Sequence, residues 1–161
     1  MSILNNVKCV FDSNVRIRWL FDMVLQYEYQ FNINDVEDMM ELYHSNGWEG
    51  HSQEDIIKIF NISTHVIIAK KDAKVVGFIR ALSDGVFNAA IYDLVVHIDY
   101  QQQGIGKAMI NLMLEHLGEL SCVHLISTTG NEALYEKMGF RKLKTGMAIY
   151  QNQKLKDEYT V

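Results

Sequence analysis

The chain has 161 residues, of which 48% are hydrophobic and 22% are charged, and its formal net charge is -5 at pH 7. This length fits one domain, and the composition is that of an ordinary globular protein, which argues against intrinsic disorder and against a coiled coil. An acidic chain lacks the clustered positive charge that a nucleic-acid backbone requires, so we expect no nucleic-acid partner.

The cysteine content and the N-terminus indicate the compartment. Two cysteines, Cys9 and Cys122, are too few for a disulfide framework or a zinc site, and the histidines have no metal-ligand spacing, so we expect no metal. Arg16, Arg18 and Asp22 interrupt any apolar segment of a signal peptide. No stretch reaches the ~18 apolar residues of a membrane span. We therefore expect a cytoplasmic protein without membrane contact.

The chain divides into three predicted parts. Residues 1–22 form an N-terminal extension of uncertain structure, because their pattern is weak and Met23 is a plausible alternative start. Residues 23–151 form the domain, and its first predicted strand lies at residues 25–31, where apolar and polar side chains alternate. Residues 152–161 are polar and charged and predict a frayed C-terminal tail.

Two helices are predicted after the first strand. Asn34 is the expected cap of the first helix, and Gly47 follows its end. Ser52 and Asp55 have the spacing of a capping box, with Asp in place of the usual Glu or Gln, and they predict the start of the second helix.

The rest of the domain is predicted to be mostly strands. An antiparallel meander comes first, followed by an amphipathic helix and then by shorter elements. The predicted strands lie at residues 65–69, 75–82, 89–97, 123–127, 140–143 and 147–150, and the predicted helices at residues 104–116 and 131–137. The order β-α-α-β-β-β-α-β-α-β-β predicts an α+β fold with one mixed, mostly antiparallel sheet flanked by helices.

A glycine-containing loop between a strand and a helix predicts an anion site. The glycines let the backbone approach a phosphate, and the first N–H groups of the helix have no partners within it. A dinucleotide fingerprint fails because Met109 occupies its third glycine position. A nucleotide-triphosphate loop fails because Gln101 and Ala108 stand where it needs Gly and Ser or Thr. The remaining pattern is Gln101-x-x-Gly104-x-Gly106.

That pattern resembles the acetyl-coenzyme A motif Q/R-x-x-G-x-G/A of the GNAT superfamily of N-acetyltransferases. The segment 131–140, Asn-Glu-Ala-Leu-Tyr-Glu-Lys-Met-Gly-Phe, is similar to a later motif of the same superfamily, in which a helix carries a tyrosine and ends at Gly-Phe. The resemblance extends over residues 25–150 and departs from the family at Ile98, where proline is common. It implies a single GNAT-like domain that uses acetyl-CoA as co-substrate, without a metal.

The resemblance also implies which residues hold acetyl-CoA. Backbone groups of the central strand would contact the pantetheine arm and polarise the thioester carbonyl, and loop amides would hold the pyrophosphate. The strand residues are Leu94, Val95 and Val96. The loop residues are Gln101, which orders the start of the loop, and Gln102, Gln103, Gly104, Ile105, Gly106 and Lys107. Asn131 matches a position that contacts the cofactor arm.

Two residues are candidates for proton transfer. Tyr135 fits the family's tyrosine position, and a phenol with a reference pKa of about 10 can protonate the departing thiolate. Asp93 precedes the cofactor-facing strand residues and is a candidate general base, although it could instead hold the acceptor's ammonium group or pair with Arg80. His97 is an alternative base because histidine is the usual residue for proton transfer near neutral pH, but its place near the loop favours a structural role.

The acceptor is expected to lie near the first two helices, in the segment that usually lines this pocket in the family. The candidate acceptor-binding residues are Tyr43, Trp48, Arg80 and Asp93. Nearby acidic side chains would favour a cationic acceptor, or they form a solvated acidic face. These side chains are Glu37, Asp38, Glu41 and Glu54.

The sequence therefore predicts an acetyl-CoA-dependent N-acetyltransferase that acts on a primary amine of a small, cationic acceptor by direct attack in a ternary complex. A non-catalytic acyl-CoA-binding sensor module is one alternative, and a protein or peptide N-acetyltransferase is another. A homodimer is possible, because dimers are common in the family. The identity of the amine depends on the shape of the acceptor pocket.

Overall fold

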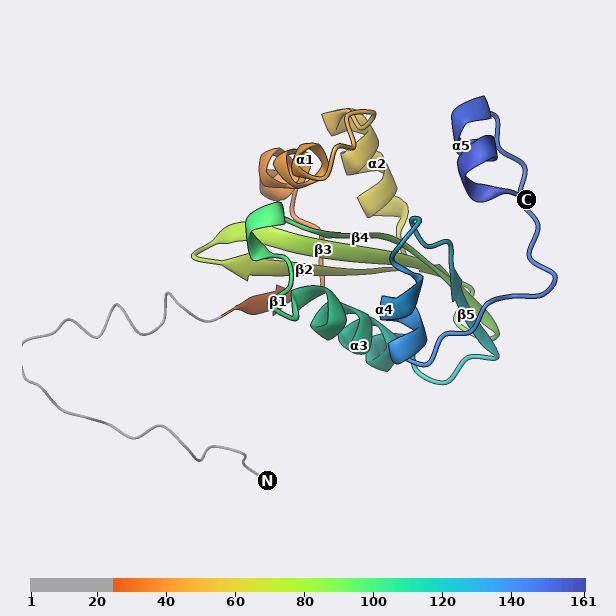
Figure 1. Cartoon of the computed structure of the whole chain (residues 1–161). Helices are drawn as coiled ribbons and strands as arrows, with labels where there is room; N and C mark the ends of the chain where they lie inside the picture. The colour runs from red at the N-terminus through yellow and green to blue at the C-terminus, as the bar shows by residue number, and fades with distance from the viewer. Residues whose placement is uncertain (1–24) are drawn as a thin grey trace, which may run out of the picture.

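The computed structural model describes residues 25–161, so the predicted N-terminal extension, residues 1–22, lies outside the described residues. The described elements follow one another along the chain as Figure 1 shows. They are β1 (Gln26–Glu28), the 3-10 helix η2 (Ile33–Asp35), α1 (Val36–Ser45), α2 (Gln53–Ile62), β2 (His65–Lys71), β3 (Lys74–Ser83), β4 (Asn88–Val96), the 3-10 helix η3 (Ile98–Tyr100), α3 (Ile105–Leu117), β5 (Cys122–Leu125), α4 (Glu132–Lys137) and α5 (Gln153–Tyr159).

A five-stranded sheet in the order β1-β2-β3-β4-β5 forms the centre of the described chain. Its strands pair antiparallel except β4 and β5, which pair parallel, so the predicted mixed α+β fold is confirmed. Helices α1 and α2 lie on one face of the sheet, and α3 and α4 lie on the other (Figure 1). The buried side chains accordingly form one cluster with α3 and another with α1 and α2. Because both faces are covered, β3 is buried almost without interruption.

Close packing between β3 and α3 fixes the helix that follows the glycine loop. A Cβ atom at Gly77 would lie 2.9 Å from Met109 Cε and 3.1 Å from the Val95 carbonyl oxygen, so the Met109 side chain would have to shift and the contact with Val95 would be unusually tight. Gly77 therefore lets α3 approach the sheet closely, and the start of α3 is held against the end of β4.

A bulge in β4 separates its second half from β5. Phe78 pairs with Val95 and Arg80 pairs with Tyr92, so two steps along β3 correspond to three along β4. Asp93 lies within this bulge, and its φ of 48° is in the left-handed region. The pairing of β4 with β5 ends at Ile91, although β4 continues to Val96. Over residues 92–96, the edge of β4 on the β5 side has no strand partner among the described residues.

The predicted helix starts are partly correct. The capping box of Ser52 and Asp55 is confirmed at the start of α2. The predicted Asn34 cap is wrong, because the Asn32 side chain accepts the N–H of Asn34 at 3.0 Å and a 3-10 turn precedes α1. Apolar periodicity predicts which face of a helix is buried more reliably than it predicts the residue at which the helix begins.

The predicted closing strands at residues 140–143 and 147–150 are not formed. After α4 the chain adds no further strand to the sheet, and the side chains of Met147 and Ile149 are 98% and 91% exposed. Alternating apolar residues form a strand only where they meet a partner, and here the outer edge of β5 is paired to no other strand among residues 25–161. The expected frayed tail contains the short helix α5 instead, which begins after the Asn152 cap.

Candidate active site

The loop between β4 and α3 has the backbone conformation of an anion site. Gly104 has a φ of 84° at the N-cap of α3, and Gln102 has a φ of 61° just before it. This left-handed backbone is easy for glycine and costs a non-glycine residue energy, so the Gln102 conformation must be held by its surroundings. The loop turns the chain so that α3 begins beside the unpaired part of β4.

Backbone N–H groups are available along this loop. The first intrahelical bond is donated by Ala108 to the Gly104 carbonyl at 2.9 Å. Within residues 25–161, no hydrogen bond is donated by the N–H groups of residues 102–107. These donors and the positive end of the α3 dipole favour an anion, and the exposed Lys107 adds a positive charge at the same end.

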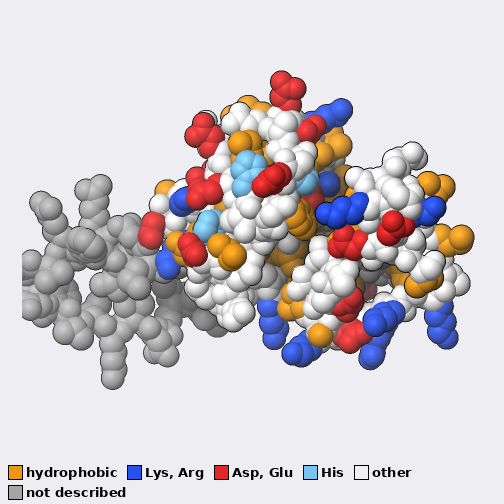
Figure 2. All heavy atoms as spheres, turned by 45° about the horizontal axis from the view of Figure 1, so that its top comes forward, with side chains coloured by type: hydrophobic (Ala, Val, Ile, Leu, Met, Phe, Trp, Pro, Cys, Tyr) orange, Lys and Arg blue, Asp and Glu red, His pale blue; other side chains and the backbone are white. Residues whose placement is uncertain are grey.

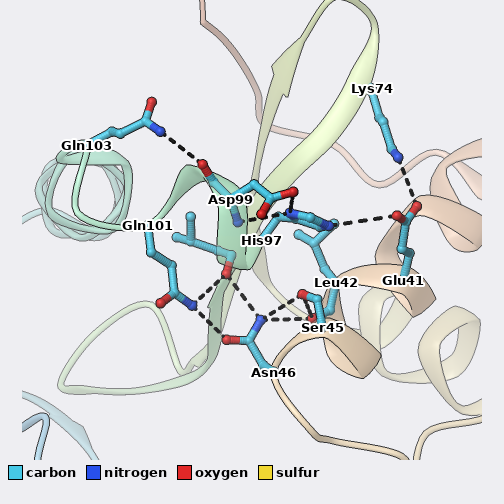
Figure 3. A network of polar contacts seen from close by, with 10 residues as sticks. Glu41, Leu42, Ser45, Asn46, Lys74, His97, Asp99, Gln101 and Gln103 are labelled. Atoms are coloured by element: carbon cyan, nitrogen blue, oxygen red, sulfur yellow. Dashed lines mark hydrogen bonds and ion pairs between the residues drawn. The ribbon is translucent and has the colours of Figure 1, made fainter.

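The first residue of the loop is held by the end of α1 (Figure 3). The Gln101 side-chain amide donates to Asn46 Oδ1 at 2.8 Å and to the Val96 carbonyl at 3.1 Å. The Asn46 amide donates to the same Val96 carbonyl at 3.1 Å and to the Leu42 carbonyl at 2.9 Å. The Val96 carbonyl is therefore occupied by two side chains, while the loop start is fixed to a helix on the other side of the sheet.

His97 forms a second link between the end of β4 and α1. Its Nδ1 accepts the backbone N–H of Asp99 at 3.3 Å, and its Nε2 lies 3.7 Å from Glu41 (Figure 3). Lys74 pairs with Glu41 at 2.9 Å and, mainly through that hydrogen bond, lowers the pKa of the Glu41 carboxyl. Through these contacts His97 links α1 to the start of the loop, which is a structural role.

Arg80 and Asp93 form an ion pair between β3 and β4 at the bulge. The Arg80 Nε–H donates to Asp93 Oδ2, and the two side chains are only 12% and 15% exposed. Arg80 also lies 4.8 Å from the centroid of the Tyr92 ring and donates to Ser63 Oγ at 3.4 Å. The guanidinium is therefore held by three partners, and it fixes one oxygen of the Asp93 carboxylate.

An aromatic stack lies beside this pair. The Tyr43 ring centroid is 4.1 Å from that of His51 and 5.9 Å from that of Trp48. Tyr43 is fully buried, and its hydroxyl and the His51 Nδ1 are buried without a hydrogen-bond partner within residues 25–161. Burial raises the pKa of the Tyr43 hydroxyl, and the nearby charge of Asp93 raises it further. Tyr43 thus forms the base of this stack, and Trp48, which is partly exposed, forms its outer part.

Tyr135 lies on α4, on the far side of the sheet from the aromatic stack. Its ring packs edge-on against Phe140 with centroids 5.9 Å apart, and burial raises the pKa of its hydroxyl. Together with residues of β5, of the segment after α4 and of α5, it lines a cavity of about 780 Å³. Asn131, at the N-cap position of the same helix, donates to Thr128 Oγ1 at 2.8 Å.

Acidic side chains are spread over the face formed by α1 and α2 (Figure 2). Those noted in the sequence, Glu37, Asp38, Glu41 and Glu54, belong to these two helices. Asp38 accepts the backbone N–H of Val75 at 2.9 Å, and Glu41 pairs with Lys74. Two of the four therefore have structural partners, while Glu37 and Glu54 are exposed. This arrangement leaves Glu37 and Glu54 to face solvent or a cationic acceptor.

The structure brings the predicted residues together in two groups. The loop residues, the end of β4 and Asn46 form one group, and Arg80, Asp93, Tyr43 and Trp48 form the other. Asp93 and the loop do not line the cavity that contains Tyr135. Sequence reasoning missed two residues, Asn46 and His51. In the sequence, Asn46 could be recognised only as a residue near a helix end, because it precedes Gly47. Its hydrogen bond with Gln101 joins residues 55 positions apart, and no local sequence pattern indicates such a contact.

No three His, Cys, Asp or Glu side chains within residues 25–161 are grouped so that they could hold a metal ion. In the same part of the chain, no helix combines the length and apolar character needed to cross a lipid bilayer.

Comparisons with known proteins identify the family. The sequence profile of the Acetyltransferase (GNAT) family matches residues 33–140. An uncharacterized N-acetyltransferase, ycf52, of Pyropia yezoensis is 35% identical, covering 78% of this chain and 74% of the relative. A GNAT-family acetyltransferase of Streptococcus pneumoniae has a solved structure that is 28% identical, with a TM-score of 0.69 over 81% of this chain and 99% of that protein. A Thermoplasma acidophilum N-acetyltransferase solved with coenzyme A shares the fold, with 19% identity and a TM-score of 0.64 over 77% of this chain and 94% of its own.

Proposed function

The chain belongs to the GNAT family of acetyltransferases, and we propose that it transfers acetyl from acetyl-CoA to a primary amine of a small, cationic acceptor. The observation that carries the proposal is the left-handed loop at the start of α3, whose N–H groups at residues 102–107 donate no hydrogen bond within residues 25–161. This loop lies beside the unpaired end of β4. A diphosphate linked to an extended arm needs such a pair of features: N–H donors for the phosphates, and a free strand edge along which the arm can lie.

The residues present fit acetyl-CoA. The N–H groups of residues 102–107 are available to the pyrophosphate, and Lys107 lies at the same helix end. Leu94 would offer backbone groups at the unpaired edge of β4 to the pantetheine arm, whereas Val95 lies opposite Phe78 in the ladder with β3. The Val96 carbonyl already accepts two side-chain donors. Asn131 would contact the arm from the start of α4. Acetyl-CoA itself supplies the acetyl group as a thioester.

Asp93 would prepare the amine. The Arg80 guanidinium holds Oδ2 of the carboxylate, which leaves Oδ1 to bind an ammonium group and accept its proton, directly or through water. The amine nitrogen then forms a bond to the acetyl carbon, the bond from that carbon to sulfur breaks, and the nitrogen loses its second proton to solvent to leave a neutral amide. Asp93 afterwards releases its proton to solvent. A backbone N–H of the unpaired β4 segment polarises the carbonyl during attack.

Tyr135 would return a proton to the departing thiolate. Burial raises the pKa of the Tyr135 hydroxyl above its ordinary value, so this group stays protonated near neutral pH and can act as the donor. The phenolate that remains is reprotonated from water. Because both reactants are held in one complex, the reaction needs no covalent acyl-enzyme.

Purified protein tested with acetyl-CoA against polyamines, arylalkylamines, amino acids and peptides, with products detected by mass spectrometry, checks this proposal. We expect acetylation of a small amine that carries a further positive charge. Binding of acetyl-CoA without turnover of any amine would instead indicate a sensor module. Turnover restricted to peptides would indicate a peptide N-acetyltransferase.

A further inference from the structure

Asn46 connects the end of α1 to the loop between β4 and α3. It lies at the C-terminal end of α1, immediately before Gly47, and its side chain points toward Gln101 (Figure 3). Its amide oxygen accepts from Gln101 at 2.8 Å, and its amide nitrogen donates to the Val96 carbonyl at 3.1 Å.

We infer that Asn46 is a positioning residue for acetyl-CoA: it holds Gln101 so that the loop keeps its phosphate-binding conformation before the ligand arrives. This inference rests on the proposed function, because it concerns the same site. Gln101 immediately precedes Gln102, whose left-handed φ of 61° is unfavourable for a side-chain-bearing residue. Without the contacts of Gln101, the loop would adopt this conformation only part of the time. Part of the binding free energy of acetyl-CoA would then be needed to order the loop, and the affinity would fall.

The geometry favours a joint action of the two amides. Each of them donates to the same Val96 carbonyl, and they are also bonded to one another, so the three groups form a closed triangle. Removing either amide leaves the other with an incomplete set of partners. The effects of two such substitutions are therefore expected to overlap rather than add.

Ser45 offers a matched control on the same helix turn. Its hydroxyl donates to the Leu42 carbonyl at 2.9 Å and accepts from Asn46 at 3.2 Å, and it makes no hydrogen bond with the loop. Ser45→Ala thus removes a contact at the end of α1 while leaving the triangle in place.

The test measures the dissociation constant of acetyl-CoA by calorimetry for the full chain and for Asn46→Ala, Gln101→Ala, the double variant and Ser45→Ala. Each of the first two should raise the constant about three- to tenfold, the usual value of one hydrogen bond. The double variant should resemble the single ones, and Ser45→Ala should resemble the wild type. Binding of S-acetylpantetheine, which lacks the pyrophosphate, should be unchanged in all of them when followed by NMR.

Several results would overturn the inference. They are an unchanged constant for Asn46→Ala, additive losses in the double variant, or an equal loss for S-acetylpantetheine. If Asn46→Ala does not fold, Gln101→Ala decides alone, because its side chain is on an exposed loop and an unchanged constant there overturns the inference. A wild-type chain that binds no acetyl-CoA would overturn the proposed function and this inference with it, whereas wild-type binding with unaffected variants overturns only the inference.

Discussion

The carboxylate of Asp93 is held by the guanidinium of Arg80 at the one bulge between β3 and β4 within the described residues. The bulge places Asp93 out of register, in a left-handed backbone conformation, where the unpaired end of β4 begins. Bulges commonly redirect a side chain toward a site. The pair therefore serves two purposes in our proposal: it stabilises the bulge, and it orients one carboxylate oxygen.

Replacing Asp93 by Asn should lower kcat/KM for the amine by about 10²–10⁴-fold, the usual size of a general-base effect. Asn tolerates the left-handed backbone, so the bulge should survive while the proton acceptor is lost. Steady-state kinetics measures this. Arg80→Gln is the control, since it breaks the same ion pair and keeps the carboxylate. Equal losses in both variants would mean that Asp93 acts only as the partner of Arg80.

Replacing Tyr135 by Phe should lower kcat by about 10²–10⁴-fold and leave the dissociation constant of acetyl-CoA nearly unchanged. The substitution removes one hydroxyl and keeps the ring that packs against Phe140. The loss should appear in kcat because the thiolate charge develops only as the thioester breaks. Kinetics combined with calorimetry separates the two effects. A wild-type kcat, with the chemical step shown to limit the rate, would remove Tyr135 from the mechanism.

The pH profile gives an independent check on the same hydroxyl. Burial raises the pKa of Tyr135 from its ordinary value of 10.0, so the donor form persists into the alkaline range. We expect no decline of kcat from this group below about pH 10. A decline well below that pH in the wild type that is absent in Tyr135→Phe would contradict the predicted direction of the pKa shift.

Acetyl-CoA should raise the melting temperature of the protein, and Gly104→Val should abolish the increase. A β-branched residue strongly disfavours a φ of 84°, so the loop cannot keep its phosphate-binding form. Thermal melting with and without millimolar acetyl-CoA measures the effect. Gly50→Val is the matched control, because Gly50 has no left-handed backbone and open space at its Cβ. An undiminished increase for Gly104→Val would contradict the assignment of the loop.

Two methionines of equal size should respond differently to truncation. Met113 is fully buried under the sheet, so Met113→Ala should cost about 2–5 kcal/mol of unfolding free energy. Met147 lies almost entirely in solvent, so Met147→Ala should change it by about 0.5 kcal/mol or less. Denaturant unfolding compares them. A cost for Met147→Ala close to that for Met113→Ala would show that the segment after α4 is packed against another surface in solution.

Asp84 should titrate below its ordinary range. Its carboxylate accepts the backbone N–H groups of Asn88, Val86 and Phe87, which lower its pKa to about 2. Because the folded pKa lies below the unfolded one, the stabilising effect is complete above about pH 4 and is lost as the pH falls toward 2. An NMR titration of the side chain gives the midpoint. A midpoint at or above 3.8 would show that the turn between β3 and β4 is not capped in this way.

The elements that depend on local pattern were predictable from the sequence. Alternation and apolar periodicity located the strands of the meander and the helices, because each depends on which side chains face the core. The glycines of the loop indicated an anion site for the same reason: a left-handed turn at Gly104 is a property of the residue itself. The resemblance to GNAT acetyltransferases rested on these local motifs and is confirmed.

The remaining features were decided only by tertiary structure. Whether residues 140–150 form strands depends on a partner edge, which a strand cannot supply for itself. The pairing of Arg80 with Asp93 was one of several roles that the sequence left open for Asp93, and the structure confirms the pair. The contact of Asn46 with Gln101 and the burial of Tyr43 against His51 join residues from different elements. Their hydrogen bonds and stacking arise when helices and strands pack together, so no local pattern encodes them. The sequence by itself therefore determined the fold family and the loop, and tertiary packing decided which side chains hold that loop and orient the candidate base.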